Sequence, residues 1–368
     1  MKLVLIRPSF YDWCQNKLFT EGTSFISLYQ EAFSLWKKFA YQQGFELATW
    51  DQAPLEKADI FWFLDLPPSR REFERICAQL RPKTPLVLQI LESPVFGTHA
   101  FDSRNTQDFQ AILSYEYPEV LRSRPGYFHY HLPNQRHQPT SNLAYSDRRG
   151  LLLLNSNRVE GWFAMRQVGL AGLPGIGKLL SGWHCSPKLF QEVLAGELYS
   201  RRRCIARLAE TIDSHFLDIY GRGWNGEQIS WCPIYPNPSY RSWRGIPQLS
   251  KWTLCEQYRF VLSFENFRGD RGYISEKIFD PLFAGSVPVY LGDEQIEDYI
   301  PAEAFIDARN FENDRELLRY LIAFPEEKWQ EMKRVGQDFL KSENFKFFES
   351  MSFSSIATQI LQKLNRQV

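Results

Sequence analysis

The sequence lacks long hydrophobic runs. The apolar stretch near the N-terminus covers only residues 3–6, which is far too short for a signal peptide or a membrane span. No later segment approaches the roughly 18 consecutive apolar residues of a transmembrane helix. We therefore expect a cytoplasmic protein without a transmembrane anchor. Peripheral association with a membrane surface stays open.

Cysteine pairs and metal-binding motifs are also absent. The six cysteines form no Cys-x-x-Cys pair, which predicts free thiols in a reducing compartment. The chain has no Asp-x-Asp, no His-Glu-x-x-His and no Gly-x-Ser-x-Gly segment. The first two absences argue against a transferase that binds its substrate through a metal ion. The third argues against the commonest hydrolases. We expect a protein that needs neither a metal ion nor a cofactor.

The chain also has no excess of charge of either sign. The chain has 43 basic and 43 acidic residues, so its net charge is zero, which argues against a nucleic-acid-binding protein. Aromatic residues are abundant at 15%. Such rings either stack on sugars and bases or fill hydrophobic cores.

The chain does contain a repeated alternation of short apolar runs and helical patterns. With 368 residues, it exceeds the size of one hydrophobic core, so we expect two domains. Residues 3–6, 60–64 and 85–91 are typical of buried strands, and residues 24–43 have helical spacing. After a polar stretch at residues 133–150, a second series of strands is predicted at 151–154, 216–220, 260–264 and 287–291.

This order predicts an α/β fold with two Rossmann-like domains that face each other across a cleft. We place the domains at residues 1–145 and 146–345, followed by an amphipathic C-terminal helix in residues 346–368. In such folds, ligands bind at the carboxyl ends of the strands.

The densest set of polar residues follows the predicted strand 260–264. Glu265 and Asn266 end this strand, and a glycine-bearing loop leads to Ser275, a good N-cap for the next helix. The free N–H groups of a helix N-terminus and the charge of Lys277 favour an anion such as a diphosphate. Glu276 is suited to accept hydrogen bonds from sugar or ribose hydroxyls. The alternative is a capped surface helix with both charges in solvent.

The sequence of residues 264–289 as a whole resembles a known family. Phe-Glu-Asn at 264–266, Tyr-Ile-Ser-Glu-Lys at 273–277 and Pro-Val at 288–289 resemble the motif of the α-1,3-fucosyltransferases, glycosyltransferase family 10. Ser275 stands where the family usually has threonine. Segments 155–157, 197–203 and 217–224 resemble the soluble bacterial branch of the family.

The resemblance implies the two-domain fold called GT-B and an inverting transfer of L-fucose from GDP-fucose. The acceptor would be a hydroxyl of a glycan that contains N-acetylglucosamine or glucose, in an α-1,3 linkage, as in protein glycosylation. Residues 1–145 would then bind the acceptor and residues 146–345 the donor. The implied donor-binding residues are Asn157, Arg201, Glu265, Asn266, Tyr273, Ser275, Glu276 and Lys277.

The resemblance also implies a phosphate-binding arginine at the head of the helix near residue 200. A guanidinium can hold phosphate oxygens bidentately. Arg201 fits this role best by its spacing, but Arg202 and Arg203 are adjacent, so the register stays open.

The implied catalytic base is Glu92, in a Glu-Ser-Pro segment that follows the predicted strand 85–91. A carboxylate in a closed cleft can have its pKa raised enough to accept a proton from a hydroxyl. From its position alone, Glu92 would be a loop-capping residue. His129 and His131 are interpreted as structural. Two alternatives remain: the same fold with another donor such as UDP-galactose, and a glycan- or nucleotide-binding protein without activity.

Overall fold

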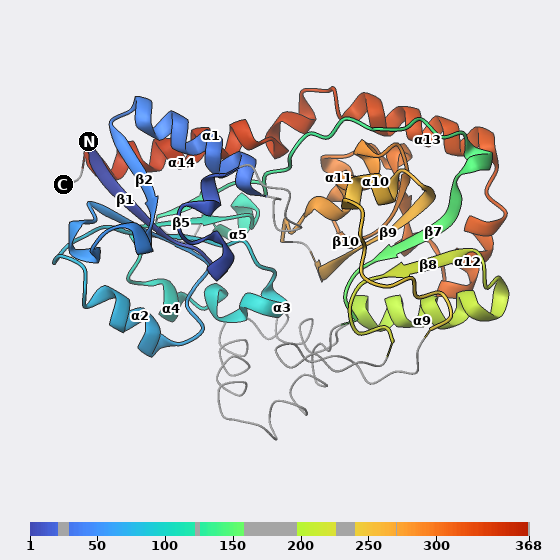
Figure 1. The fold of residues 1–368 in the computed structure, drawn as a ribbon, viewed down its shortest axis with the longest axis horizontal. Coiled ribbons are helices and arrows are strands. Elements are labelled where there is room, and N and C mark those ends of the chain that lie inside the picture. Colours follow the sequence, from blue (N-terminus) through green and yellow to red (C-terminus); the bar gives the residue numbers. More distant parts are fainter. Residues whose placement is uncertain (21–28, 122–125, 158–196, 226–239, 270, 367–368) are drawn as a thin grey trace, which may run out of the picture. The chain divides into compact units, whose positions relative to one another are not determined.

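The computed structural model describes residues 1–20, 29–121, 126–157, 197–225, 240–269 and 271–366 (Figure 1). The described chain folds into two compact units. Unit 1 contains residues 1–20, 29–121, 126–135 and 346–366, and unit 2 contains residues 136–157, 197–225, 240–269 and 271–345. Each unit is built on one parallel sheet, which confirms the predicted α/β fold class.

Unit 1 contains a six-stranded sheet in the order β2-β1-β3-β4-β5-β6, with all neighbours parallel. The strands predicted at residues 3–6, 60–64 and 85–91 correspond to β1, β3 and β4. The strands are β1 (Lys2–Arg7), β2 (Phe45–Thr49), β3 (Ile60–Leu64), β4 (Leu86–Gln89), β5 (Ala111–Ser114) and β6 (Tyr127–His129). The helices between them are α1 (Gln30–Gln42), α2 (Arg70–Cys77), α3 (Pro94–Gly97), α4 (Ser103–Thr106) and α5 (Pro118–Leu121).

The C-terminal helix α14 (Ser350–Asn365) packs in unit 1, beside α1 (Figure 1). The rings of Phe33 and Phe353 meet edge to face with their centroids 5.3 Å apart. The Ser354 hydroxyl donates a hydrogen bond to the carbonyl oxygen of Ala32 at 3.2 Å. The apolar face of this segment, predicted from its helical spacing, therefore covers the first helix of the chain.

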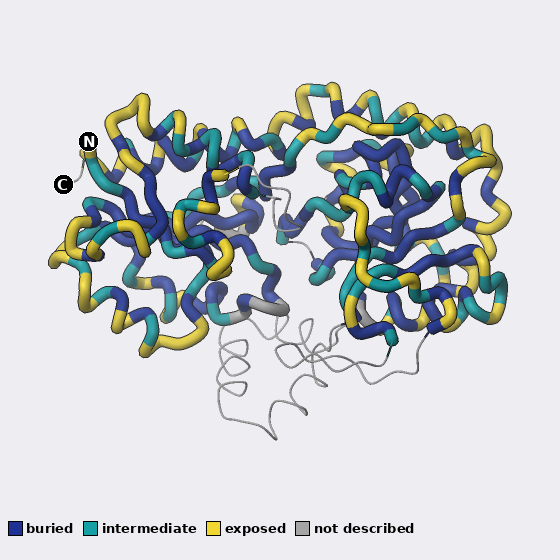
Figure 2. The backbone as a smooth tube through the Cα atoms, in the orientation of Figure 1, coloured by how far each residue is buried: buried dark blue, intermediate teal, exposed yellow. Residues whose placement is uncertain are grey.

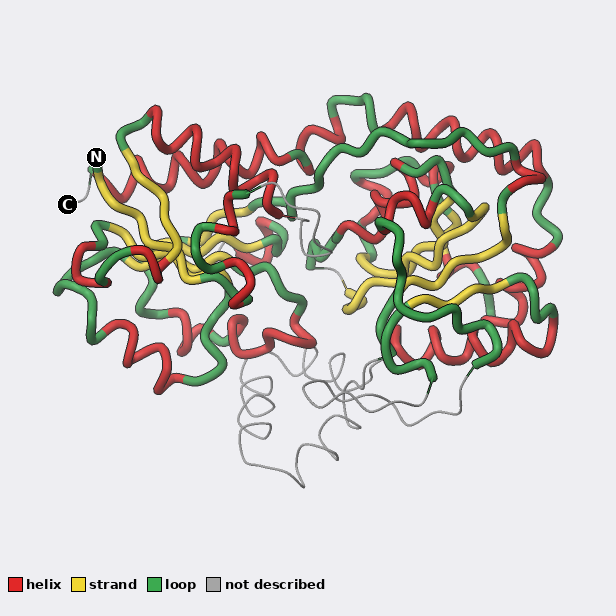
Figure 3. Tube along the Cα trace, viewed as in Figure 1, coloured by secondary structure: helices red, strands yellow, loops and turns green. Residues whose placement is uncertain are grey.

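Unit 2 contains a five-stranded parallel sheet in the order β11-β10-β9-β7-β8. Its strands are β7 (Arg149–Leu154), β8 (Leu217–Tyr220), β9 (Tyr258–Gly269), β10 (Val287–Asp293) and β11 (Ile306–Asp307). Its helices are α9 (Glu197–Ile212), α10 (Lys251–Cys255), α11 (Glu276–Phe283), α12 (Asp314–Ile322) and α13 (Glu326–Phe339). Figure 3 shows helices on both sides of the yellow strands.

Alternate residues of β7 contribute to two different cores. Leu151 and Leu153 belong to the cluster that includes residues of α9 and α12, whereas Leu152 packs with Leu254 of α10 and Ala284. Side chains alternate across a strand, so a strand covered on both faces is a continuous apolar run. Burial on both faces explains why the four consecutive leucines at residues 151–154 predicted a strand. Most strand residues are accordingly buried (Figure 2).

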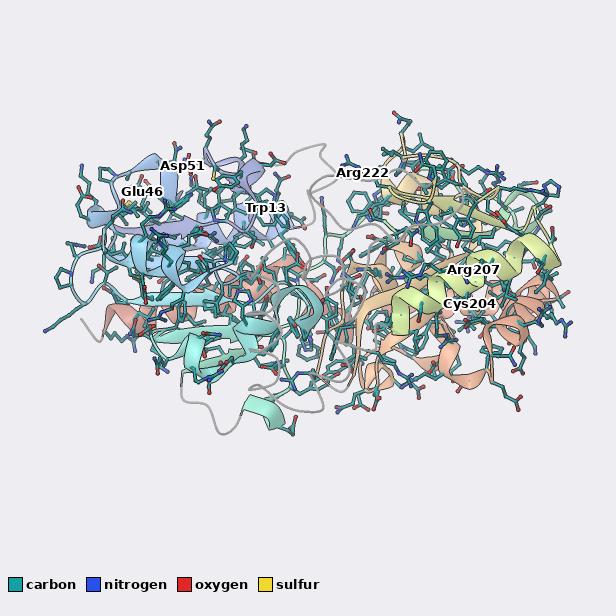
Figure 4. All side chains as sticks on the ribbon, turned by 90° about the horizontal axis from the view of Figure 1, so that it is seen from below. Trp13, Glu46, Asp51, Cys204, Arg207 and Arg222 are labelled. Atoms are coloured by element: carbon teal, nitrogen blue, oxygen red, sulfur yellow. The ribbon has the colours of Figure 1, made fainter. Side chains whose placement is uncertain are left out.

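The described cysteines are Cys14, Cys77, Cys204 and Cys255, and all four are free thiols. Cys204 is exposed and projects from α9 one turn before Arg207 (Figure 4). The prediction of free thiols is confirmed for these four positions.

Candidate functional site

The loop after β9 is held against the end of β10. β9 extends to Gly269, which pairs with Asp293 of β10 after a register shift. Gly272 has φ +87°, a conformation that favours glycine. Its N–H donates a hydrogen bond of 2.7 Å to the Asp293 carboxylate. Sequence analysis missed Asp293, although its place at the end of a predicted strand was a usable signal.

Glu265 is completely buried on β9, one residue after Phe264, where the regular pairing with β10 ends. The predicted strand end at Glu265 and Asn266 was wrong, because β9 continues to Gly269 after the register shift. Its carboxylate accepts one hydrogen bond from the Ser275 N–H at 2.8 Å and one from the Ser275 hydroxyl at 2.6 Å. The Lys277 ammonium lies 3.7 Å from the same carboxylate. Burial raises the pKa of Glu265, and Lys277 acts in the opposite direction. Glu265 therefore fixes the N-terminus of α11.

The first turn of α11 brings together three of the predicted residues. The Ser275 hydroxyl accepts the N–H of Lys277 at 3.4 Å, which confirms Ser275 as the N-cap. The Lys277 ammonium lies 3.2 Å from the Ser275 hydroxyl and 3.4 Å from the Glu276 carboxylate. Burial opposes the ionisation of Glu276, but Lys277 and Lys251 outweigh it and lower its pKa to about 2. A carboxylate and an ammonium thus lie side by side at the helix N-terminus.

The arginines of α9 differ in their surroundings. Arg202 is buried and donates hydrogen bonds to the carbonyl oxygens of Phe264 and, at 2.8 Å, of Glu265. The Arg201 guanidinium pairs with Asp314 at 2.7 Å and lies 5.4 Å from the centre of the Phe264 ring. Arg203 is buried, so Arg201 is the most exposed of the three. Arg202 therefore ties α9 to the carboxyl end of β9.

Asn157 lies in the loop after β7, beside the loop after β8. Its backbone N–H donates to the carbonyl oxygen of Arg222 at 2.9 Å, and its side-chain amide donates to that of Gly223 at 3.0 Å. Its side-chain oxygen is buried and makes no hydrogen bond in the described part of the chain. A buried acceptor without a donor is costly, so this oxygen is a candidate contact for a ligand.

Residues 195–346 match the sequence profile of glycosyltransferase family 10 (fucosyltransferase), C-terminal part. This region of the chain is therefore similar to the C-terminal part of that family. The matched segment contains α9, the loop after β9 and the start of α11, and so includes every predicted donor residue except Asn157.

Curated relatives match over limited stretches. Human α-(1,3)-fucosyltransferase 7 is 33% identical over 136 residues, which are 36% of this chain and 34% of the relative. Mouse 4-galactosyl-N-acetylglucosaminide 3-α-L-fucosyltransferase 9 is 48% identical over 65 residues, 17% of this chain and 18% of the relative. The chain thus covers about a third or less of the length of these two relatives.

The fold also matches solved glycosyltransferase structures. The β-glucosyltransferase of phage T4 superposes with a TM-score of 0.50 at 10% identity, and the match covers 98% of this chain and 99% of that chain. A likeness at this identity concerns the fold alone. The two parallel α/β units therefore correspond to the predicted GT-B fold.

Two further predicted donor residues of the family 10 region lie near Ser275. Tyr273 is buried in the loop that leads to α11, and Asn266 is half-buried on β9, next to Glu265. The structure therefore brings Glu265, Asn266, Tyr273 and the Ser275 cap to one edge of the unit 2 sheet. Arg201 reaches the same edge through Phe264, the residue before Glu265.

Glu92 lies in unit 1, at the carboxyl end of its sheet, just after β4. Its N–H donates to the Asp65 carboxylate at 3.0 Å, and its carbonyl oxygen accepts the Tyr115 hydroxyl at 3.0 Å. The N–H of Leu91 donates to the same Asp65 oxygen at 2.8 Å. Asp65 has φ +53° and is half-buried, and desolvation raises the pKa of its carboxyl. Sequence analysis missed Asp65, whose role depends on a contact between separate strands.

The described residues contain no group of three or more His, Cys, Asp or Glu side chains arranged to hold a metal ion. Among the helices of the described residues, none is long and apolar enough to cross a membrane.

Proposed function

We propose that this protein is an inverting fucosyltransferase that moves L-fucose from GDP-fucose to a hydroxyl group of a glycan. The observation that carries the proposal is the N-terminus of α11 in the family 10 region. There, a buried glutamate, the Ser275 cap and Lys277 form one hydrogen-bonded unit. Helix N–H groups next to a full positive charge suit a diphosphate.

In this proposal the diphosphate of the donor binds at the N–H groups of α11, with Lys277 and Arg201 as its cations. To reach phosphate, Arg201 exchanges its Asp314 partner for the ligand or holds both. Glu276 carries a negative charge at neutral pH because its pKa is about 2. It therefore accepts hydrogen bonds from ribose or fucose hydroxyls, together with Asn157, Asn266 and Tyr273.

The reaction is a single displacement. Glu92 takes the proton of the acceptor hydroxyl, the hydroxyl oxygen forms a bond to the anomeric carbon of fucose, and the bond from that carbon to GDP breaks. The negative charge that develops on the departing diphosphate as the bond breaks is stabilised by Lys277, Arg201 and α11. Protein groups supply this stabilisation, so the proposal includes no metal ion and no cofactor.

The acceptor we propose contains N-acetylglucosamine or glucose, with fucose attached in an α-1,3 linkage. The support is the name of the mouse relative, a 4-galactosyl-N-acetylglucosaminide 3-α-L-fucosyltransferase. We also propose that the fucose is attached to protein-bound glycans and that the reaction takes place in the cytoplasm.

The test is an activity assay with GDP-fucose and a panel of galactose-, glucose- and N-acetylglucosamine-terminated acceptors, with and without EDTA. We expect turnover in both conditions and none with UDP-galactose. Absence of turnover, of GDP-fucose hydrolysis and of GDP-fucose binding would refute the proposal. Loss of activity in EDTA would contradict metal independence alone.

Two variants separate binding from chemistry. Lys277→Met removes one cation of the diphosphate site and should weaken GDP binding by about tenfold, or ~1.4 kcal/mol. Lys328→Met removes one exposed lysine of α13 and should leave GDP binding unchanged. Glu92→Gln should keep GDP-fucose binding and lose turnover. A Glu92→Gln variant with full activity would exclude Glu92 as the base.

A further inference from the structure

Unit 2 contains a cavity of about 560 Å³ whose lining includes no carboxylate. It is formed by the polar segment before β7, the turn after α11 and one face of α13. The lining residues that matter here are Asn142, Arg148, Gly285, Gln330, Lys333 and Gln337. The volume is that of a small-molecule site.

The cavity lies at the amino edge of the unit 2 sheet. Arg148 immediately precedes β7, and Gly285 lies two residues before β10. The Arg148 guanidinium donates to the carbonyl oxygen of Tyr258, the first residue of β9, at 3.2 Å. Ser275 and Lys277 follow the other end of β9, and the eight residues of α11 span about 12 Å between the two edges. The cavity is therefore separate from the proposed donor site.

Two cations face the cavity without a carboxylate partner. Arg148 is buried, and its hydrogen bonds go to three carbonyl oxygens and the Ser286 hydroxyl. Lys333 donates to the side-chain oxygen of Asn142 at 3.1 Å. In the part of the chain that the structure describes, neither side chain forms an ion pair. Arg334 also lines the cavity, but its charge is matched by Glu331 and Asp338.

The two cations converge on one place. The Arg148 guanidinium lies 5.2 Å and the Lys333 ammonium 5.4 Å from the centre of the Trp329 ring. Burial and the charge of Arg148 lower the pKa of Lys333. A Cβ at Gly285 would lie 3.0 Å from Lys333 Cε and 3.6 Å from an Arg148 nitrogen, and Gly285 has φ +66°. Glycine keeps the space between the two cations open.

A nearby carboxylate compensates this pair only in part: burial lowers the pKa of Arg148 to about 10, and the charge of Glu256 opposes this shift without cancelling it. Glu256 is buried and accepts hydrogen bonds from the N–H groups and hydroxyls of Thr140 and Ser141. It forms no ion pair with Arg148 within the described residues. Two like charges in a partly dry site repel each other strongly, and an anion between them would remove this cost.

We infer that this cavity binds a small phosphate-bearing anion between Arg148 and Lys333, at a second site remote from the donor. Arg148 donates from Nε and Nη1 to protein oxygens and once from Nη2, so it keeps one Nη2 N–H and its charge for a phosphate oxygen. Lys333 adds a mobile charge. The amides of Asn142, Gln330 and Gln337 are suited to hydroxyl groups on the same molecule. A sugar phosphate meets both requirements.

The test uses the full chain and inorganic phosphate as the probe. The acetylation rate of each lysine is measured by mass spectrometry in phosphate and in sodium chloride of equal ionic strength. At phosphate concentrations about ten times the dissociation constant, Lys333 should react about tenfold more slowly. Lys328, an exposed lysine on the same helix, should react at the same rate in both salts. Equal rates at Lys333 in both salts, or equal protection of both lysines, would overturn the inference.

Matched variants give a second measurement. Lys333→Gln should weaken phosphate binding at this cavity by about tenfold in calorimetry, and Lys328→Gln should leave it unchanged. Glucose 1-phosphate in place of phosphate tests the hydroxyl contacts and should bind more tightly than phosphate alone. If Lys333→Gln does not fold, acetylation of the unmodified protein still decides the question. Unchanged phosphate binding in a folded Lys333→Gln protein would exclude the site.

Discussion

The carboxylate of Glu265 accepts both the backbone N–H and the hydroxyl of Ser275, at 2.8 and 2.6 Å. This pair connects β9 to the N-cap of α11, ten residues later in the chain. Because Glu265 is buried, each lost donor leaves a buried charge less compensated.

Ser275→Ala should therefore destabilise the protein by about 1–3 kcal/mol, since it removes a donor to a buried carboxylate and the helix cap together. GDP binding should weaken in the same variant because the first turn of α11 loses its anchor. Ser275→Thr keeps the hydroxyl and should retain both properties. Denaturant unfolding and calorimetry with GDP give the two readouts. An alanine variant as stable as the threonine variant would contradict the assigned role of the hydroxyl.

How much of this site could be predicted from sequence depends on the range of each interaction. The N-cap Ser275 and the apolar face of α11 were predictable, because capping and helical periodicity are local. The burial of Glu265 beneath the cap was not predicted, since it results from the pairing of β9 with β10. Asp293 and Asp65 were also missed, because their partners lie in loops that follow neighbouring strands: Gly272 after β9, and Leu91 and Glu92 after β4.

The arginines of α9 show the same limit. Sequence spacing left three candidates for one phosphate ligand. Which arginine faces the ligand depends on the angle at which the helix crosses the sheet. The structure separates their surroundings: Arg202 holds backbone carbonyls, and Arg201 holds a carboxylate.

Arg202→Ala should destabilise unit 2 by about 3 kcal/mol, because it leaves buried carbonyl oxygens without a charged donor. Arg201→Ala leaves the buried Asp314 carboxylate without its cation, so it should also destabilise unit 2, by roughly 1–3 kcal/mol. It should in addition weaken GDP binding by about tenfold or more. Asp314→Asn frees Arg201 from its ion pair and serves as the control, with GDP binding retained or improved. Thermal unfolding and calorimetry on the same samples compare the three. Normal GDP binding by a folded Arg201→Ala protein would exclude Arg201 as the phosphate-binding residue.

Asp65 should act as a positioning residue for Glu92. One oxygen of its carboxylate accepts the N–H groups of both Leu91 and Glu92. Asp65→Ala removes this acceptor and should lower kcat about tenfold or more, with little change in the KM for GDP-fucose, because the donor residues lie in unit 2. Asp65→Asn keeps a carbonyl oxygen and tolerates the left-handed backbone conformation, so it should retain most activity. A rise in the KM for GDP-fucose with kcat unchanged would argue against this role.

His129 and His131 should make the stability of unit 1 depend on pH. The two ring nitrogens lie 3.4 Å apart, and His129 also bonds the carbonyl oxygen of Glu116 at 2.8 Å. Burial lowers the pKa of His129 to about 4 and, with the neighbouring His129, that of His131 to about 3. Both rings are therefore neutral in the folded protein at neutral pH, in agreement with a structural role.

The sign of the pH effect follows from proton uptake. In the unfolded chain each histidine titrates near pH 6.5, so between that pH and about 4 the unfolded state binds protons that the folded state does not. The free energy of unfolding should fall as the pH falls, by roughly 2 kcal/mol per histidine at about pH 5. His131→Phe keeps a ring against Phe348 and cannot titrate, so it should remove about half of this loss. His215→Gln, at an exposed position, should leave the pH dependence unchanged. Urea unfolding of the three proteins from pH 7 to 5 measures the slopes. Equal slopes for the His131→Phe and unmodified proteins would exclude the His129–His131 pair as the cause.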